Sequence, residues 1–178
     1  MSKINVNVKT RGFDELRKKL RELPRRVENR VLLQSLKTGA RPINRAIKSL
    51  APVASPEQTT RGVNIAMGGG RGLLKKSIGI RGKMKRNKSQ AYVLVGPRRK
   101  QFRTIIGSDK KGKQVVMNPT NYAHLQERGH TIKIHGRIVA RNPGTKFMEK
   151  GTSQATSAAQ AAVESKMAQG IAREAAKA

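Results

Sequence analysis

The apolar residues near the start of the chain change their period between residues 4 and 23. Aliphatic side chains first occupy every second position, which predicts a half-buried strand over residues 4–8. After Gly12 apolar side chains recur every three or four positions, which predicts a short helix with Asp14 in its first turn. The two patterns consist of Ile4, Val6 and Val8 for the strand, and Phe13, Leu16, Leu20 and Leu23 for the helix.

A second, longer helix is predicted over residues 25–50. Pro24 ends the first helix and is a suitable start for the next one. Gly39 and Pro42 lie inside the second helix, so we expect a kink near them. Its apolar stripe consists of Val27, Val31, Leu32 or Leu33, Leu36, Ala40, Ile43, Ile47 and Leu50.

Shorter elements follow the second helix. Residues 53–72 are rich in Pro, Ser, Thr and Gly and have little periodicity, which predicts a long extended loop. Residues 73–82 and 90–96 predict two strands joined by a basic turn. A second extended loop is expected over residues 97–114, with a short hairpin whose tip lies near residues 107–112.

The last third of the chain predicts a small hairpin between two helices. Residues 115–117 are a further strand fragment, and NYAHLQERGH is a short helix or turn closed by Gly129. Residues 130–142 predict a hairpin that turns at Gly136. Residues 147–178 are rich in Ala, Gln and Ser, which predicts a long C-terminal helix. Its thin apolar stripe consists of Val163, Met167 and Ile171.

Together these elements predict a single α+β domain over residues 1–178. We expect a mainly antiparallel sheet packed by the two N-terminal helices, with the C-terminal helix crossing it. Gly151 and Gly170 are expected to weaken the ends of that helix. A length of 178 residues suffices for one domain, and with 3% aromatic residues its core must be aliphatic and modest.

The chain carries a formal charge of +29, concentrated between Arg61 and Asn118, where 16 lysines and arginines accompany one acid, Asp109. A domain this positive repels copies of itself unless a polyanion or acidic partner offsets the field. Aromatic residues for base stacking are few, and no sequence-reading motif appears, so we expect salt-dependent contact with backbone phosphates. The candidate residues for contact with DNA or an acidic partner are Arg81, Lys83, Lys85, Arg86, Lys88, Arg98, Arg99, Lys100 and Arg103.

Residues that could support catalysis or bind a metal are sparse. The chain has no cysteine, which excludes disulfides and thiolate-bound zinc or iron–sulfur sites. His130 and His135 are an odd number of positions apart, so on a strand they face opposite sides. The ten acids form no D-x-D cluster to hold magnesium, and MGGGRGLLKK lacks P-loop spacing. We therefore expect a binding protein with no cofactor, no metal and no enzymatic activity.

Nothing in the sequence indicates a membrane or secretory protein. No apolar run approaches the roughly 20 residues that span a bilayer. The N-terminal segment lacks the apolar stretch of a secretory signal. We expect a soluble protein, made inside a cell, with no membrane partner.

Five short motifs occur in an order that resembles a known family. They are GFDEL at 12–16, AIKSLAP at 46–52, LKKSI at 74–78, YAHLQERG at 122–129 and PGTKFM at 143–148. This order resembles the tail-completion, or head–tail joining, family of long-tailed bacteriophages, related to the lambda minor tail protein Z group. The resemblance covers nearly the whole chain, and the YAHLxExG box followed by the Phe-Met box is its most specific part.

The resemblance implies a structural virion protein that completes the tail or neck and joins it to the DNA-filled head. It implies a hexameric ring, assembled in the host cytoplasm, that contacts head-completion or connector proteins and the tail terminator or tail tube. The end of the genomic DNA would lie in a basic channel that holds its phosphates. The residues expected to shape the fold or the subunit interface are Tyr122, His124, Glu127, Gly129, Phe147 and Met148.

Two alternatives stay open from the sequence. The charge also suits a cellular nucleoid- or ribosome-associated protein that binds nucleic acid without reading its sequence. A structure-specific nuclease would cleave DNA with Mg²⁺ and lose that activity on Glu127→Ala. For Glu127 itself, an ordinary salt bridge at a helix end is the alternative to a role in the fold or an interface.

Overall fold

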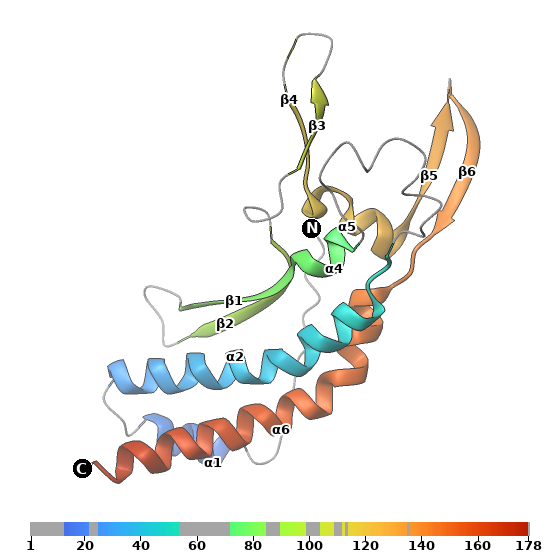
Figure 1. Cartoon of the computed structure of the whole chain (residues 1–178). Helices are drawn as coiled ribbons and strands as arrows, with labels where there is room; N and C mark the ends of the chain where they lie inside the picture. The colour runs from blue at the N-terminus through green and yellow to red at the C-terminus, as the bar shows by residue number, and fades with distance from the viewer. Residues whose placement is uncertain are drawn as a thin grey trace. The chain divides into compact units, whose positions relative to one another are not determined.

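A computed structural model of the chain confirms an α+β fold of long helices and short antiparallel strands (Figure 1). The described chain forms two compact units. The helical unit is drawn from Met1–Ala46, Ile80–Val95 and Thr152–Ala178, and the junction unit from Ile47–Gly79 and Gly96–Gly151. The structure describes residues 13–21, 25–53, 72–84, 90–98, 104–108, 112, 114–134 and 136–177.

Several predictions from the sequence fall outside the described residues. These are the strand over 4–8, Leu23 of the first helix, most of the 53–72 loop, His135, and six of the candidate contact residues: Lys85, Arg86, Lys88, Arg99, Lys100 and Arg103. The single domain over residues 1–178 stays a prediction.

One short and two long helices lie where the sequence pattern predicts them. Helix α1 spans Phe13–Arg21, α2 spans Arg25–Leu50 and α6 spans Phe147–Ala175. Helix α2 continues through Pro42 as one element. Acidic residues lie in the first turns of all three helices and basic residues in their last turns, which suits the helix dipole.

The core of the helical unit lies between α2 and α6, which run antiparallel. Val31, Val163 and Met167 are buried there, and Leu16, Val27, Leu32 and Ile171 pack around them. Fully burying a valine or methionine side chain stabilises a fold by about 1.5–3 kcal/mol, so the three buried side chains contribute most to this core. The four-residue spacing predicted for α6 is confirmed, and it extends toward the N-terminus through the buried Ala159 and Ala155.

Gly39 and Gly170 allow the two helices of this core to approach closely. A Cβ atom at Gly39 would contact the Val163 side chain and lie 2.8 Å from the Ala159 carbonyl oxygen. A Cβ atom at Gly170 would lie 2.6 Å from Cγ1 of Val31. Both glycines therefore have a packing role that helix propensity does not reveal.

The short elements after α2 begin differently from the prediction. Residues Leu73–Ser77 form a short helix, α4, so the strand predicted from residue 73 is wrong over these five positions. One helical turn buries both Leu74 and Ser77, and the Ser77 hydroxyl donates to the Leu74 carbonyl at 2.7 Å. Strand β1, Ile78–Met84, follows directly and pairs with β2, Ala91–Pro97, as predicted.

The remaining strands form two more hairpins. Strand β3, Thr104–Ser108, pairs antiparallel with β4, Gln114–Met117, which confirms a hairpin in the basic loop. Strand β5, Gly129–Ile134, pairs antiparallel with β6, Arg137–Pro143, and Gly136 has a φ of 79° at the turn. Among the described residues the strands thus form three two-stranded sheets, since each strand pairs with its neighbour in the sequence.

Candidate functional site

Helix α5, Pro119–Arg128, carries the YAHLxExG box and begins with a well-defined cap. The Asn118 side chain accepts a hydrogen bond from the Thr120 backbone N–H at 3.1 Å, and Pro119 occupies the first turn, where a missing N–H costs nothing. Tyr122 is half-buried, and this burial raises the pKa of its phenol. His124 is exposed on the same helix.

The C-terminal end of α5 is capped by the segment that leads into α6. The last carbonyls of a helix have no partner within it. Here the Thr145 backbone N–H donates to the Gln126 carbonyl at 2.8 Å, and the Thr145 hydroxyl donates to the same oxygen at 2.9 Å. The Lys146 N–H donates to the Glu127 carbonyl at 3.1 Å. Residues 145–146 therefore provide hydrogen-bond donors for the last carbonyl groups of α5.

In return, the Glu127 side chain accepts hydrogen bonds from backbone N–H groups at the beginning of α6. Its two carboxylate oxygens accept hydrogen bonds from the Met148 N–H at 2.8 Å and the Glu149 N–H at 3.0 Å. These are N–H groups of the first turn, where the helix dipole favours a negative charge. The two helices thus cap each other, and among the described residues the partners of the Glu127 carboxylate are backbone N–H groups of α6.

Two glycines let the backbones meet at this junction. Gly129 has a φ of 82°, and a Cβ there would contact the Asn142 carbonyl oxygen and lie 2.5 Å from the Gly144 nitrogen. A Cβ at Gly144 would contact the Glu127 carbonyl oxygen and lie 2.5 Å from the Gly129 nitrogen. Gly129, two residues after the glutamate, and Gly144, directly after Pro143, therefore form the two sides of one close backbone contact.

Lys146 is the strained residue of the junction. Its φ is 51°, in the left-handed region that a residue other than glycine seldom adopts. Its carbonyl accepts the first helical bond of α6, from the Lys150 N–H at 2.9 Å. A lysine side chain has no acceptor with which to cap a helix. Glu127 supplies that acceptor from α5.

The site residues predicted from the sequence divide into two groups. Four of them meet at the α5–α6 junction: Glu127, Gly129, Met148 and Phe147, a residue that is only 1% exposed. Tyr122 and His124 lie on α5. The sequence-based list lacked Gly144 and Lys146, although the Pro143-Gly144 dipeptide marks a turn and could have indicated them.

The geometry of this junction is that of a structural joint. Both Glu127 oxygens are engaged by backbone N–H groups. The described part of the chain contains no group of three His, Asp or Glu side chains positioned to hold a metal ion. His130 follows Gly129 on β5, and its buried Nδ1 atom has no hydrogen-bond partner there.

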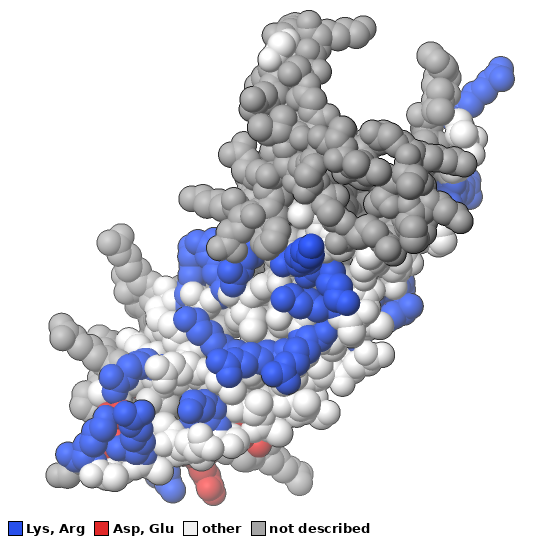
Figure 2. Space-filling model, viewed as in Figure 1, with Lys and Arg blue, Asp and Glu red and all other residues white. Residues whose placement is uncertain are grey.

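The predicted basic surface is described at three positions. Arg81 and Lys83 lie two residues apart on β1 and are exposed, whereas Gly82 between them faces Leu33 and Lys37 of α2. Arg98 follows β2, and its guanidinium lies across Gly79. Figure 2 shows that lysine and arginine, in blue, cover far more of the visible described surface than the acids, in red.

A family model matches residues 14–129, about two thirds of the chain, and is described as "Bacteriophage HK97-gp10, putative tail-component". The chain belongs to this family. The match runs from the first turn of α1 to Gly129, so it includes the YAHLxExG box and its glutamate. No curated protein and no solved structure matches the chain.

Membership of the HK97 gp10-like family gives the protein a coarse role as a structural component of a phage tail, and hence a place in the virion. It confirms the resemblance to a phage-tail family over residues 14–129. In the described residues no helix is long and apolar enough to cross a membrane.

Proposed function

We propose that this protein completes the tail or neck of a long-tailed phage and joins it to the DNA-filled head. Six copies form a ring around the DNA, between the head-completion or connector proteins and the tail terminator or tail tube. The observation that carries the proposal is membership of a family of phage tail components. Motif order supports the finer assignment to tail completion.

The charge of the chain supports a position beside DNA. A ring of subunits at +29 each repels itself strongly unless a polyanion or acidic neighbour lies close. The exposed Arg81 and Lys83 project from the same strand, and Arg98 lies beyond β2. Such contacts hold phosphates without reading bases.

The β5–β6 hairpin supports a role in assembly. Every residue of β6 is exposed, including Ile138 at 52% and Val139 at 59%. Val139 is the extra residue of a β-bulge, since Ile132 pairs with Ala140 and Lys133 with Ile138. A two-stranded hairpin is marginally stable alone. Contact with a neighbouring subunit or virion protein would bury these aliphatic side chains.

The alternative, a cellular protein that binds nucleic acid freely, is favoured by the charge alone. Its salt-dependent binding would resemble that of a phage channel. Family membership favours the phage role over it.

Deletion of the gene from the phage genome that encodes this chain tests the proposal. Negative-stain microscopy of the induced lysate is expected to show DNA-filled heads separate from loose or aberrant tails. Supplying the protein in trans should restore joined particles. Intact, infectious virions from the deletion strain would overturn the proposal.

A further inference from the structure

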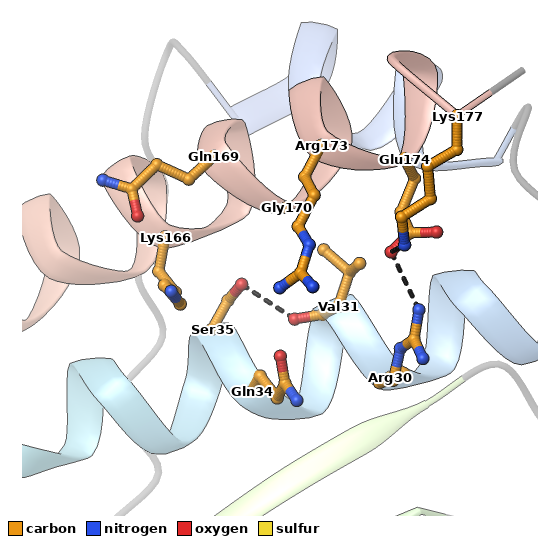
Figure 3. Close-up of a pocket in the computed structure, with 10 residues that line it drawn as sticks. All are labelled: Arg30, Val31, Gln34, Ser35, Lys166, Gln169, Gly170, Arg173, Glu174 and Lys177. Carbon is orange, nitrogen blue, oxygen red and sulfur yellow. Dashed lines mark hydrogen bonds and ion pairs between the residues drawn. The ribbon is translucent and has the colours of Figure 1, made fainter.

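A hollow of about 280 Å³ lies between α2 and α6 within the helical unit (Figure 3). Its floor is tightly packed, because Gly170 brings α6 against Val31, and the fully buried Ser35 donates its hydroxyl to the Val31 carbonyl at 2.8 Å. Its walls are polar and come from both helices. They include Arg30 and Gln34 of α2 and Lys166, Gln169, Arg173 and Lys177 at the α6 end.

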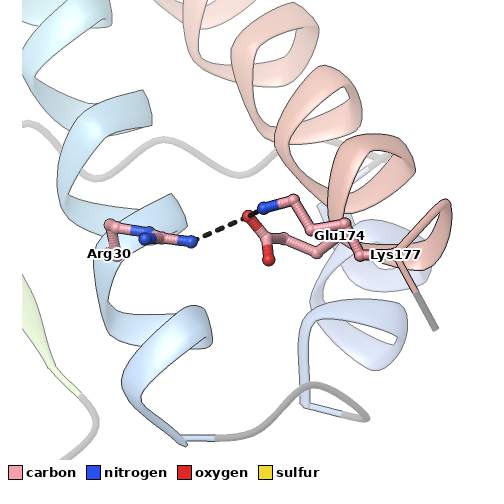
Figure 4. Close-up of polar contacts among 3 residues, drawn as sticks. All are labelled: Arg30, Glu174 and Lys177. Carbon is pink, nitrogen blue, oxygen red and sulfur yellow. Dashed lines mark hydrogen bonds and ion pairs between the residues drawn. The ribbon is translucent and has the colours of Figure 1, made fainter.

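Cations outnumber acids by four to one among the residues that line this hollow. The one acid among the described lining residues, Glu174, forms ion pairs with Arg30 at 2.8 Å and Lys177 at 3.0 Å through the same oxygen (Figure 4). The hydrogen bond from Lys177, with the charges of Lys177 and Arg30, lowers the pKa of Glu174, so the carboxylate is ionised at neutral pH. One negative charge is thus shared by two cations.

Lys166 and Arg173 are the cations that this arrangement leaves without a negative charge. They lie seven residues apart on α6, so they share one face of the helix. Neither side chain has an ion-pair or hydrogen-bond partner within the part of the chain that the structure describes. In Figure 3 the Arg173 side chain extends from α6 toward α2, above Gln34.

A phosphate group is the anion that these side chains fit. An arginine fork can bind two of its oxygens, and a lysine ammonium adds a point charge. The amides of Gln34 and Gln169 can donate further hydrogen bonds. The hollow is slightly smaller than the usual range of ligand pockets, and none of its described lining residues is aromatic, so it suits a backbone phosphate better than a base.

We propose that this hollow binds one phosphodiester group of double-stranded DNA through Lys166 and Arg173, with Gln34 and Gln169 completing the contact. The choice of DNA as the source of the anion rests on the proposed function. It also agrees with the +29 charge, which favours a polyanion with many regularly spaced charges. The site lies apart in sequence from the basic tract over residues 81–113.

The test measures binding of the purified full chain to a labelled DNA duplex of mixed sequence by fluorescence anisotropy, between about 50 and 200 mM salt. The double variant Lys166→Gln and Arg173→Gln is expected to bind roughly tenfold more weakly. It should also reduce the slope of log K against log salt by about 1, as expected for one lost phosphate contact. Arg41→Gln with Arg45→Gln removes the same charge from exposed positions of α2 outside the hollow, and should change both quantities less.

Two isosteric variants distinguish a contact in the hollow from a general effect of the protein's net charge. Gln34→Glu places a carboxylate in the hollow and should weaken DNA binding more than Gln154→Glu, which adds the same charge at an exposed position of α6. Circular dichroism melting of each variant verifies that it is folded. Equal effects of the hollow and control variants would overturn the proposal. So would a hollow variant that loses binding to poly-glutamate while it binds DNA normally, because an acidic protein would then be the ligand.

The outcome is separable from that of the proposed function. A wild-type chain that binds DNA through other residues would overturn the hollow alone. Intact virions from the gene deletion would overturn the joining role alone.

Discussion

The two ends of α6 each depend on one glutamate, and they use it in opposite ways. At the N-terminal end, both oxygens of Glu127 accept backbone N–H groups, and two glycines fit around the contact. At the C-terminal end, one oxygen of Glu174 accepts two cationic side chains. Backbone contacts fix the path of the chain, whereas side-chain ion pairs arrange charge on its surface.

Among these variants, Gly129→Ala is expected to destabilise the α5–α6 junction most. The new methyl group would contact the Asn142 carbonyl oxygen, and alanine would be strained at a φ of 82°. We expect a loss of about 3 kcal/mol in the free energy of unfolding, measured by chemical denaturation. Gly136→Ala is the matched control, because its φ is 79° but its Cβ would have open space. A loss of the same size in the control would show that strain alone, and not the backbone contact, matters.

Glu127→Ala tests the capping role directly. It leaves the Met148 and Glu149 N–H groups without their carboxylate, and we expect it to destabilise the fold by about 2 kcal/mol. Glu174→Ala removes only exposed or partly exposed ion pairs and should cost clearly less. Denaturant melts of both variants at low and high salt measure the difference. If Glu174→Ala were the more damaging variant, the contrast between the two ends would be wrong.

Lys146→Gly should stabilise the α5–α6 junction. Glycine removes the cost of a φ of 51°, while the Lys146 N–H bond to Glu127 is a backbone contact that glycine keeps. We expect a gain of about 1 kcal/mol in the free energy of unfolding. The control Lys150→Gly, within α6, should instead lose about 1 kcal/mol, because glycine disfavours a helix interior. A loss at both positions would contradict strain at Lys146.

The smallest expected effect is the change with pH in the stability that Glu174 contributes at the C-terminal end of α6. Because the folded-state pKa of Glu174 lies below the ordinary value of 4.5, its contribution to stability is present at neutral pH. It should disappear as the pH falls below 4.5 and through the folded-state pKa. Glu174→Gln should therefore lower the melting temperature slightly at pH 7 and not at strongly acid pH. A difference from wild type that is constant with pH would exclude this role.

The helices could be predicted from the sequence because their apolar positions repeat locally. The bounds of α2 and the four-residue stripe of α6 follow directly from such spacing. The strand predicted for LLKKSIGIRG was wrong over its first five residues, which form a helix. A single helical turn and a strand bury an apolar run of that length equally well. The separation of the strands into three hairpins depends on tertiary pairing, which local pattern does not contain.

The candidate site was predictable only in part, for a related reason. The motif EXG around Glu127 and the PG pair near Gly144 are visible in the sequence, but their contact joins segments about fifteen residues apart along the chain. The hollow between α2 and α6 was missed because its cations come from residues 30 and 166–177. Their spacing on α6 gave a signal, but the denser basic tract over residues 81–113 concealed it.

Cryo-electron microscopy of the neck of the purified phage would show whether this chain joins the head to the tail. The predicted result is a ring of copies of this chain between the head and the tail, with Lys166 and Arg173 of α6 facing the phosphates of the DNA in its channel. A location elsewhere in the tail, or absence of the chain from the virion, would contradict the role in joining head and tail.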